Sequence, residues 1–173
     1  MPYFRTAALM CGILLFSGCS PTFNWRDIRT DLTPLVALFP CKPDTSERVV
    51  PLAGHAVKMT MLGCDAGGAT FSLAYADMQD ATLSGKVLGE WKANTLGNIR
   101  TQSPKERPFL LKGADVLPQS VQVEARGTRP DGTAVSAQAV WFAVGSQVFQ
   151  AAVSTDGASP AEADTYFAGL RIQ

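Results

Sequence analysis

The chain has 173 residues, and its 15 basic and 15 acidic side chains leave it formally neutral. This length favours a single domain with a hydrophobic core of its own, so no metal is needed to stabilise the fold. Balanced charge argues against nucleic acid or an anionic membrane surface as the main partner, because such partners select basic proteins.

The first 20 residues indicate where the protein is sent. Arg5 precedes an apolar run over residues 7–16, and small residues lead from that run into Cys19. A basic start, a short apolar centre and a small-residue exit are typical of a secretory signal peptide. The run is too short for a membrane span, which needs about 20 apolar residues. We therefore expect residues 1–18 to be a signal peptide.

The junction Phe16-Ser17-Gly18-Cys19 resembles the lipobox of bacterial lipoprotein precursors. The resemblance implies cleavage before Cys19 and attachment of lipid, including palmitate, to this cysteine. Several acyl chains hold a protein on a membrane, because each buried CH₂ contributes about 0.8 kcal/mol. Ser20 after the cysteine is similar to a sorting signal for the outer rather than the inner membrane, with the domain in the periplasm. The alternative is an ordinary secretory peptide with an incidental cysteine.

Two of the four cysteines remain for the mature domain. Cys11 lies in the signal peptide, and Cys41 and Cys64 form an even pair in an exported chain, which favours a disulfide bond. Free or metal-binding thiols are the alternative. A single histidine and the absence of a C-x-x-C motif argue against metal, and we expect no metal site and no cofactor.

The first part of the mature chain predicts a tether followed by strands. Residues 19–34 lack periodic apolar positions and are expected to be the tether, with Trp25 either packed on the domain or lying at the lipid interface. A single domain is expected over residues 35–173. Strands are predicted at 35–39, 48–52, 56–62 and 70–75, with a rigid turn at 40–44. Pro51 indicates an edge strand.

The second part predicts a helix, a meander and a second helix. Leu83, Val87 and Trp91 recur every four residues, which is typical of a helix. Residues 101–108 read as a loop. Strands then resume near Phe109, alternate over 121–125, and continue over 133–144 and 147–154 around a turn at 129–132.

The end of the chain has the spacing of a capped helix. Residues 159–162 have capping-box spacing, with Pro160 at the first helical position. Tyr166, Phe167 and Leu170 then follow a helical period, Gly169 can end the helix, and residues 170–172 can add a last strand.

The order hairpin, helix, meander, helix predicts an α+β domain, with an antiparallel sheet of about six or seven strands and two main helices packed on it. The chain here resembles the Mog1/PsbP-like family. The resemblance rests on residues 38–43, on residues 71–75 and on the terminal Val148-Phe149-Gln150 and 166–170 segments. It implies a Mog1/PsbP-like sandwich and a binding or assembly role without chemistry of its own.

Candidate catalytic residues are few. His55 is the only histidine and is expected in a solvated turn. Asp77 and Asp80 could act as acid and base, or one could cap the following helix. Gly67 and Gly68 could nest an anion, although a turn is the simpler interpretation.

The aromatic residues Trp91, Trp141, Phe142 and Phe149 could line a ligand groove, or they could simply form the core. We therefore expect no enzyme but a lipid-anchored binding module of the bacterial cell envelope, with an envelope protein as partner and no nucleic acid. A small-molecule or lipid binder with a pocket between sheet and helix is the alternative.

Overall fold

The computed structural model describes residues 22–30, 32–158 and 160–173. Its large sheet is fully antiparallel and has the spatial order β3 (Asp44–Leu52), β4 (His55–Ala66), β5 (Ala69–Asp77), β9 (Gln147–Thr155), β8 (Ala134–Val144), β7 (Val121–Thr128) and β6 (Lys105–Pro108). A smaller antiparallel sheet consists of β1 (Arg26–Arg29), β2 (Leu35–Phe39) and β10 (Arg171–Ile172), with β2 in the centre.

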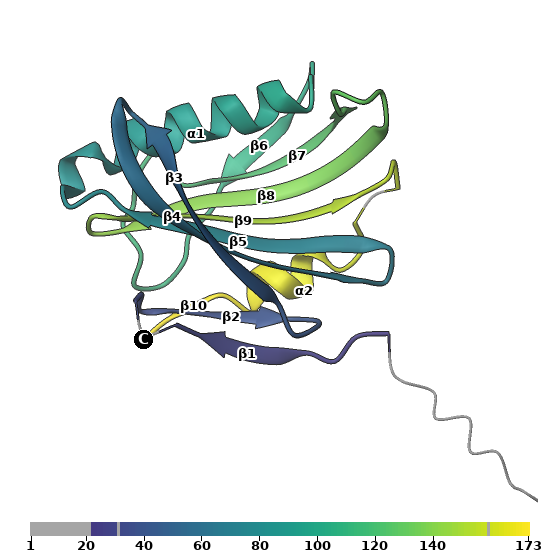
Figure 1. The fold of residues 1–173 in the computed structure, drawn as a ribbon, viewed down its shortest axis with the longest axis horizontal. Coiled ribbons are helices and arrows are strands. Elements are labelled where there is room, and N and C mark those ends of the chain that lie inside the picture. Colours follow the sequence, from purple (N-terminus) through teal and green to yellow (C-terminus); the bar gives the residue numbers. More distant parts are fainter. Residues whose placement is uncertain (1–21, 31, 159) are drawn as a thin grey trace, which may run out of the picture.

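Both faces of the large sheet are covered, one by a helix and the other by the small sheet and a second, short helix (Figure 1). Helix α1 (Ser84–Asn98) follows a short 3₁₀ turn, η1 (Ala81–Leu83), and lies on one face. The other face is covered by α2 (Ala163–Ala168) and the small sheet. None of the helices in the described part of the chain is long and apolar enough to cross a bilayer. The predicted α+β class, with an antiparallel sheet and two helices, is confirmed.

Strand alternation produces two hydrophobic cores, one on each face of the sheet. On β8, Trp141 points to the α1 side, where it joins Val87 and Trp91, while Phe142 points to the α2 side, where it stacks on Phe149. All of these side chains except Trp91, which is 8% exposed, are completely buried. A strand with apolar residues on both faces is therefore covered on both, as predicted for this part of β8.

Several predicted elements are confirmed. The hairpin of β4 and β5, helix α1, the meander of β7, β8 and β9, and the terminal strand β10 occur where the residue patterns indicate. Pro51 lies in the edge strand β3, and Gly169 caps the end of α2. Trp25 packs on the domain, with its ring edge-on to Phe71 at a centroid distance of 6.0 Å.

Four boundaries differ from the prediction. Residues 26–29, expected in the tether, form β1 and pair with β2, so the packed part of the chain begins before residue 35. The expected loop at 101–108 contains β6, whereas no strand starts at Phe109. Strand β3 begins at Asp44, within the expected turn. These segments are short or polar, and backbone pairing with a neighbouring strand determines their conformation.

The second helix also starts later than predicted. Pro160 is not its first residue, since α2 begins at Ala163 and Glu162 occupies the N-cap without a side-chain hydrogen bond. Ser159 lies outside the described residues, as do residues 1–21, so the expected capping box and the signal peptide are not seen.

The domain has two ends, which we call the near end and the far end. The described chain begins at the near end, where Phe23 packs over Gly67 in the β4–β5 turn (Figure 1). Ladder pairing places Ser136 of β8 and Ala69 of β5 on either side of Thr155 at this same end. The far end is marked by the β8–β9 turn at Gly145 and Ser146.

Candidate functional site

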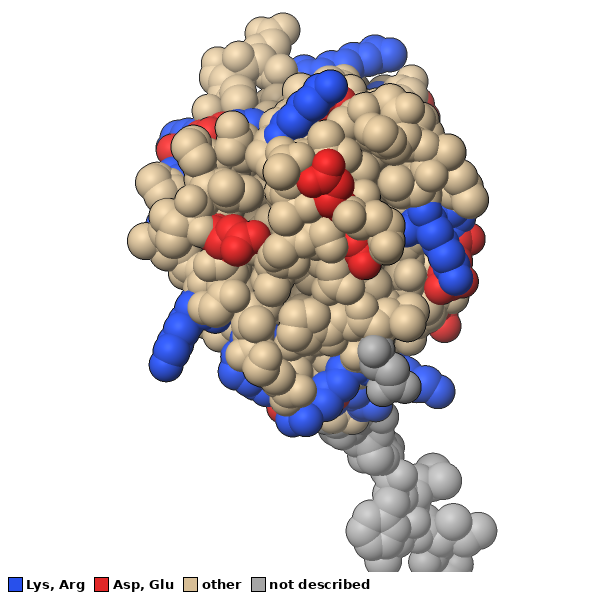
Figure 2. Space-filling model, turned by 90° about the vertical axis from the view of Figure 1, so that its left-hand side faces the viewer, with Lys and Arg blue, Asp and Glu red and all other residues tan. Residues whose placement is uncertain are grey.

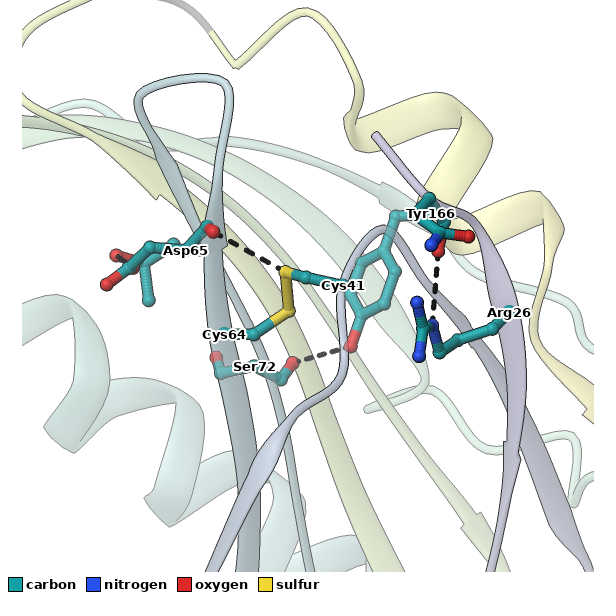
Figure 3. Close-up of a disulfide and its surroundings, with 8 residues drawn as sticks. Arg26, Cys41, Cys64, Asp65, Ser72 and Tyr166 are labelled. Atoms are coloured by element: carbon teal, nitrogen blue, oxygen red, sulfur yellow. Dashed lines mark hydrogen bonds between the residues drawn. A yellow bond between two sulfur atoms is a disulfide. The ribbon is translucent and has the colours of Figure 1, made fainter. Parts of the chain in front are cut away.

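The predicted disulfide between Cys41 and Cys64 is present and joins the two sheets (Figure 3). Its Cα atoms are 6.1 Å apart. Cys41 follows β2 and Cys64 lies in β4. Nearby, the Tyr166 hydroxyl donates to the carbonyl oxygen of Ser72 at 2.9 Å, and burial raises the pKa of this phenol. The bond thus fastens the small sheet to the large one. Cys19, the expected lipid-attachment residue, lies outside the described residues.

The candidate catalytic residues make structural hydrogen bonds. Asp80 accepts from the hydroxyl of Thr82 at 2.7 Å and from its backbone N–H at 2.8 Å, and these bonds lower the pKa of the carboxyl group. Asp77 accepts from the N–H of Gln79 and from the hydroxyl of Ser146. Asp80 therefore caps η1, as the capping interpretation predicts.

His55 is exposed at the start of β4. Its charge is the weakest of the influences that lower the pKa of Asp80. Within the described residues, no three His, Cys, Asp or Glu side chains are placed to hold a metal ion.

The aromatic residues considered for a ligand groove form core instead. Trp91 and Trp141 belong to the α1 side of the sheet, whereas Phe142 and Phe149 belong to the α2 side. The sheet itself therefore separates the two pairs, and they line no common cavity. The two glycines at 67 and 68 form a turn with positive φ, and the Phe23 ring occupies the space beside Gly67.

A hollow of about 310 Å³ lies between the face of β3, β4 and β5 and the β1–β2 connection at the far end. Leu32, Lys58, Asp77 and Gln147 are among its lining residues. The Gln147 side chain donates its amide N–H to the carbonyl oxygen of Leu32 at 2.7 Å, but its Oε1 is buried and has no partner among the described residues. Gln147 thus leaves one buried polar atom unsatisfied beside the hollow.

Exposed apolar side chains lie near this hollow. Leu32 is 62% exposed and Val116 is 83% exposed. Both are held beside the β8–β9 turn, Leu32 by its bond from Gln147 and Val116 through its neighbour Asp115, which accepts from the N–H of Gly145. Figure 2 shows this end of the molecule, a mainly uncharged surface with a few acidic groups and with basic side chains mostly around its edge.

A larger groove, of about 660 Å³, lies at the near end, where the α2 side of the large sheet is left uncovered. We call it the near-end groove. Its floor comes from β7 and β8, and Pro160 forms part of its wall. Its charged lining residues are Arg100, Lys105, Glu124 and Arg126.

Sequence reasoning missed both hollows. The alternation of Gln122, Glu124 and Arg126 does show that one face of β7 is polar. However, Arg100 and Lys105 join that face only because the chain turns back after α1, and no local pattern indicates this.

Comparison with known proteins leaves the family open. No family model matches the chain, and no curated protein matches it. One similar solved structure is a protein of unknown function from Pseudomonas aeruginosa, described as a candidate regulator. The two are 15% identical over 82% of this chain and 87% of that chain, with a TM-score of 0.38. A likeness at this level supports no inference about fold or function.

Proposed function

We propose that this protein is a lipid-anchored periplasmic lipoprotein, whose domain is a non-enzymatic binding or assembly module that contacts an envelope protein through its far end. The main support is that the exposed Leu32 and Val116 and the hollow all lie at the end opposite the start of the described chain. An exposed apolar side chain beside a hollow, as Leu32 is, is a feature of interaction sites.

The position of the expected anchor supports this orientation. Thr22 is the third residue after Cys19, so the distance between these two residues is at most about 10 Å. A lipid on Cys19 would therefore keep the near end against the bilayer and direct the far end into the periplasm. Outer-membrane placement rests on Ser20 and is part of the proposal.

The behaviour of the polar residues supports binding rather than catalysis. Asp77 and Asp80 are occupied by structural hydrogen bonds, and His55 is an exposed strand residue. The hydroxyl groups bound by Asp77 and Asp80 belong to Ser146 and Thr82, which lie in short turns. A nucleophile also needs a base that a third group orients, and His55 makes no side-chain hydrogen bond to either aspartate in the described part of the chain.

The order of strands and helices is compatible with a Mog1/PsbP-like domain, and we retain that family as a proposal. Its expected role as a binding or assembly factor agrees with the function proposed above.

A small-molecule binder remains the second candidate, favoured by the buried Oε1 of Gln147. The site would be the far-end hollow, because side chains fill the spaces between the sheet and both helices. A ligand here would donate a hydrogen bond to Gln147.

Site-specific photocrosslinking in envelope preparations tests the proposed function. A photoreactive residue at Val116 or at Leu32 should give the same protein adduct, because both positions lie at the far end. The matched control is Asn94, which is exposed on α1. The absence of any reproducible adduct at both far-end positions, or an equal adduct at Asn94, would contradict the proposal.

A further inference from the structure

The near-end groove gathers cations that have no anionic partner. Arg100, Lys105 and Arg126 form no ion pair with a carboxylate in the described part of the chain. Six other basic residues do form such pairs: Lys58, Lys86, Lys92, Arg107, Arg129 and Arg171. The groove is thus a local basic site on a chain that is neutral overall.

One carboxylate shares the groove but does not neutralise it. Glu124 lies directly across from Lys105 in the β6–β7 ladder, and the two side chains make no ion pair. The charged lining residues therefore comprise three cations and one anion. Like charges brought together without a partner favour the binding of an anion between them.

Hydrogen bonds to backbone carbonyl groups fix the segment that carries Arg100 against the strand that carries Arg126. The N–H of Thr128 donates to the carbonyl oxygen of Ile99 at 2.7 Å, and the hydroxyl of Thr101 donates to the carbonyl oxygen of Arg126 at 2.8 Å. Arg100, between these two contacts, has a φ of +49°, which is uncommon for a residue with a side chain. The bend after α1 is thus fixed against β7, with Arg100 beside the groove.

A neutral donor is also available. The Gln122 amide donates to Oε1 of Gln138 at 3.2 Å, which leaves the NH₂ group of Gln138 as a donor in the lining of the groove. Guanidinium, ammonium and amide donors together suit the oxygens of a phosphate group.

The groove lies close to the expected anchor. Pro160 lines it and also lines a neighbouring hollow that contains Thr22 and Phe23, the first described residues. Because Cys19 precedes Thr22 by three residues, a bilayer that holds the lipid would face this end of the domain.

We propose that the near-end groove binds the phosphate of an anionic lipid headgroup in the bilayer that carries the anchor. The inference rests on the lipid anchor of the proposed function and adds a second, electrostatic contact. Such a contact would restrict the domain to one orientation on the membrane. Lipid anchorage alone would keep the near end close to the bilayer but would not fix which side of that end faces it.

Lysine footprinting of the full-length lipidated protein tests this contact. The protein is reconstituted into vesicles of phosphatidylcholine alone or mixed with phosphatidylglycerol, acetylated briefly, and analysed by mass spectrometry. Acetylation of Lys105 should fall about fivefold in the anionic vesicles, the factor expected for one basic residue at an anionic surface, and should recover in 1 M salt. Lys112 is exposed in the connection between β6 and β7, outside the groove lining, and serves as the internal control.

Charge variants test whether the protection of Lys105 requires the basic groove or only closeness to the membrane. The double variant R100Q/R126Q should lose the protection of Lys105, whereas R48Q, which removes an exposed arginine of β3, should keep it. Equal protection in R100Q/R126Q would overturn the proposal. Protection by inorganic phosphate without any effect of phosphatidylglycerol would also overturn it, because the ligand would then be free phosphate.

Flotation of the protein with vesicles distinguishes a failure of the lipid anchor from a failure of headgroup binding in the groove. If the protein floats with phosphatidylcholine vesicles but Lys105 is not protected by phosphatidylglycerol, only the groove proposal fails. If the protein does not float with any vesicle, the lipid anchor fails, and the groove proposal fails with it.

Discussion

Gly127 shows how a missing side chain shapes the near-end groove. A Cβ atom at this position would lie 1.9 Å from the carbonyl oxygen of Ile99, which is backbone and cannot move aside like a side chain. The glycine therefore permits the bend after α1 to approach β7, and this approach brings Arg100 to Arg126. The choice of residue at one strand position thus decides whether the groove exists.

Gly127→Ala should lower the free energy of unfolding by about 3 kcal/mol, because overpacking against backbone forces the two segments apart. Chemical denaturation measures the change. Gly97→Ala is the matched control, since nothing lies within 4 Å of its added Cβ and alanine favours a helix over glycine. A Gly127→Ala protein as stable as the wild type would show that the close approach is not required.

Asp80 gives a prediction about pH. Hydrogen bonds from Thr82 lower the pKa of Asp80 in the folded state, so the fold favours the ionised carboxylate. Its contribution to stability is complete above the unfolded pKa of about 3.9 and is lost as the pH falls through the lower folded pKa. Asp80→Asn should therefore melt below the wild type at pH 7, and the gap should close by about pH 2.

Thermal unfolding of both proteins across this pH range checks the prediction. Asp44→Asn is the control, because Asp44 is exposed on β3 and its carboxylate accepts no hydrogen bond from the described residues. A gap between wild type and Asp80→Asn that stays constant down to pH 2 would refute the role given to the carboxylate.

Among the elements, the segments before β3 depend most on tertiary contacts. Strand β1 has only four residues and β2 only five, and neither is stable as an isolated strand. They are held by pairing with each other, by the packing of Phe39 against Tyr166, and by the disulfide that follows β2. The same disulfide joins the layer nearest the expected anchor to the main sheet.

Reduction of the Cys41–Cys64 bond should lower the free energy of unfolding by about 3 kcal/mol, as the chain-entropy model gives for a loop of this length. The two cysteines are 23 positions apart. Denaturant midpoints with and without a reducing agent measure the effect, and the double variant C41S/C64S should be insensitive to it. Identical midpoints for oxidised and reduced wild type would contradict a stabilising role.

At the scale of the whole molecule, the two ends of the domain carry different kinds of side chain. Arg100, Lys105 and Arg126 lie at the near end, where the described chain begins, and the exposed Leu32 and Val116 lie at the far end. This arrangement suits a module that contacts a membrane at one end and a partner at the other. In the function proposed above, both contacts depend on the lipid expected on Cys19.

Cys19→Ser should move the protein from the membrane to the soluble fraction, because the acyl chains provide the anchoring free energy. Fractionation followed by mass spectrometry of the N-terminal peptide checks both location and modification. Cys11→Ser is the matched control, since this cysteine precedes the expected cleavage site and should leave lipidation unchanged. A Cys19→Ser protein that remains in the membrane fraction like the wild type would refute the anchor.

Residue order alone determined the elements with strong periodicity and the pairing of the two cysteines. Phe71, Leu73 and Tyr75 alternate, and Val87 and Trp91 follow a helical period, because each repeat places apolar groups on one face. The α+β class follows from the order of these elements. The disulfide is predicted from an even pair of cysteines in a chain that is expected to be exported.

Only the tertiary structure decided the short strands and the two hollows. Four-residue strands such as β1 and β6 carry too little pattern to be distinguished from loops, and backbone pairing with β2 and β7 defines them. Arg100 and Arg126 are brought together by a backbone approach that Gly127 allows. A site made by segments distant in sequence has no local signal, because its residues become neighbours only when the sheet is assembled.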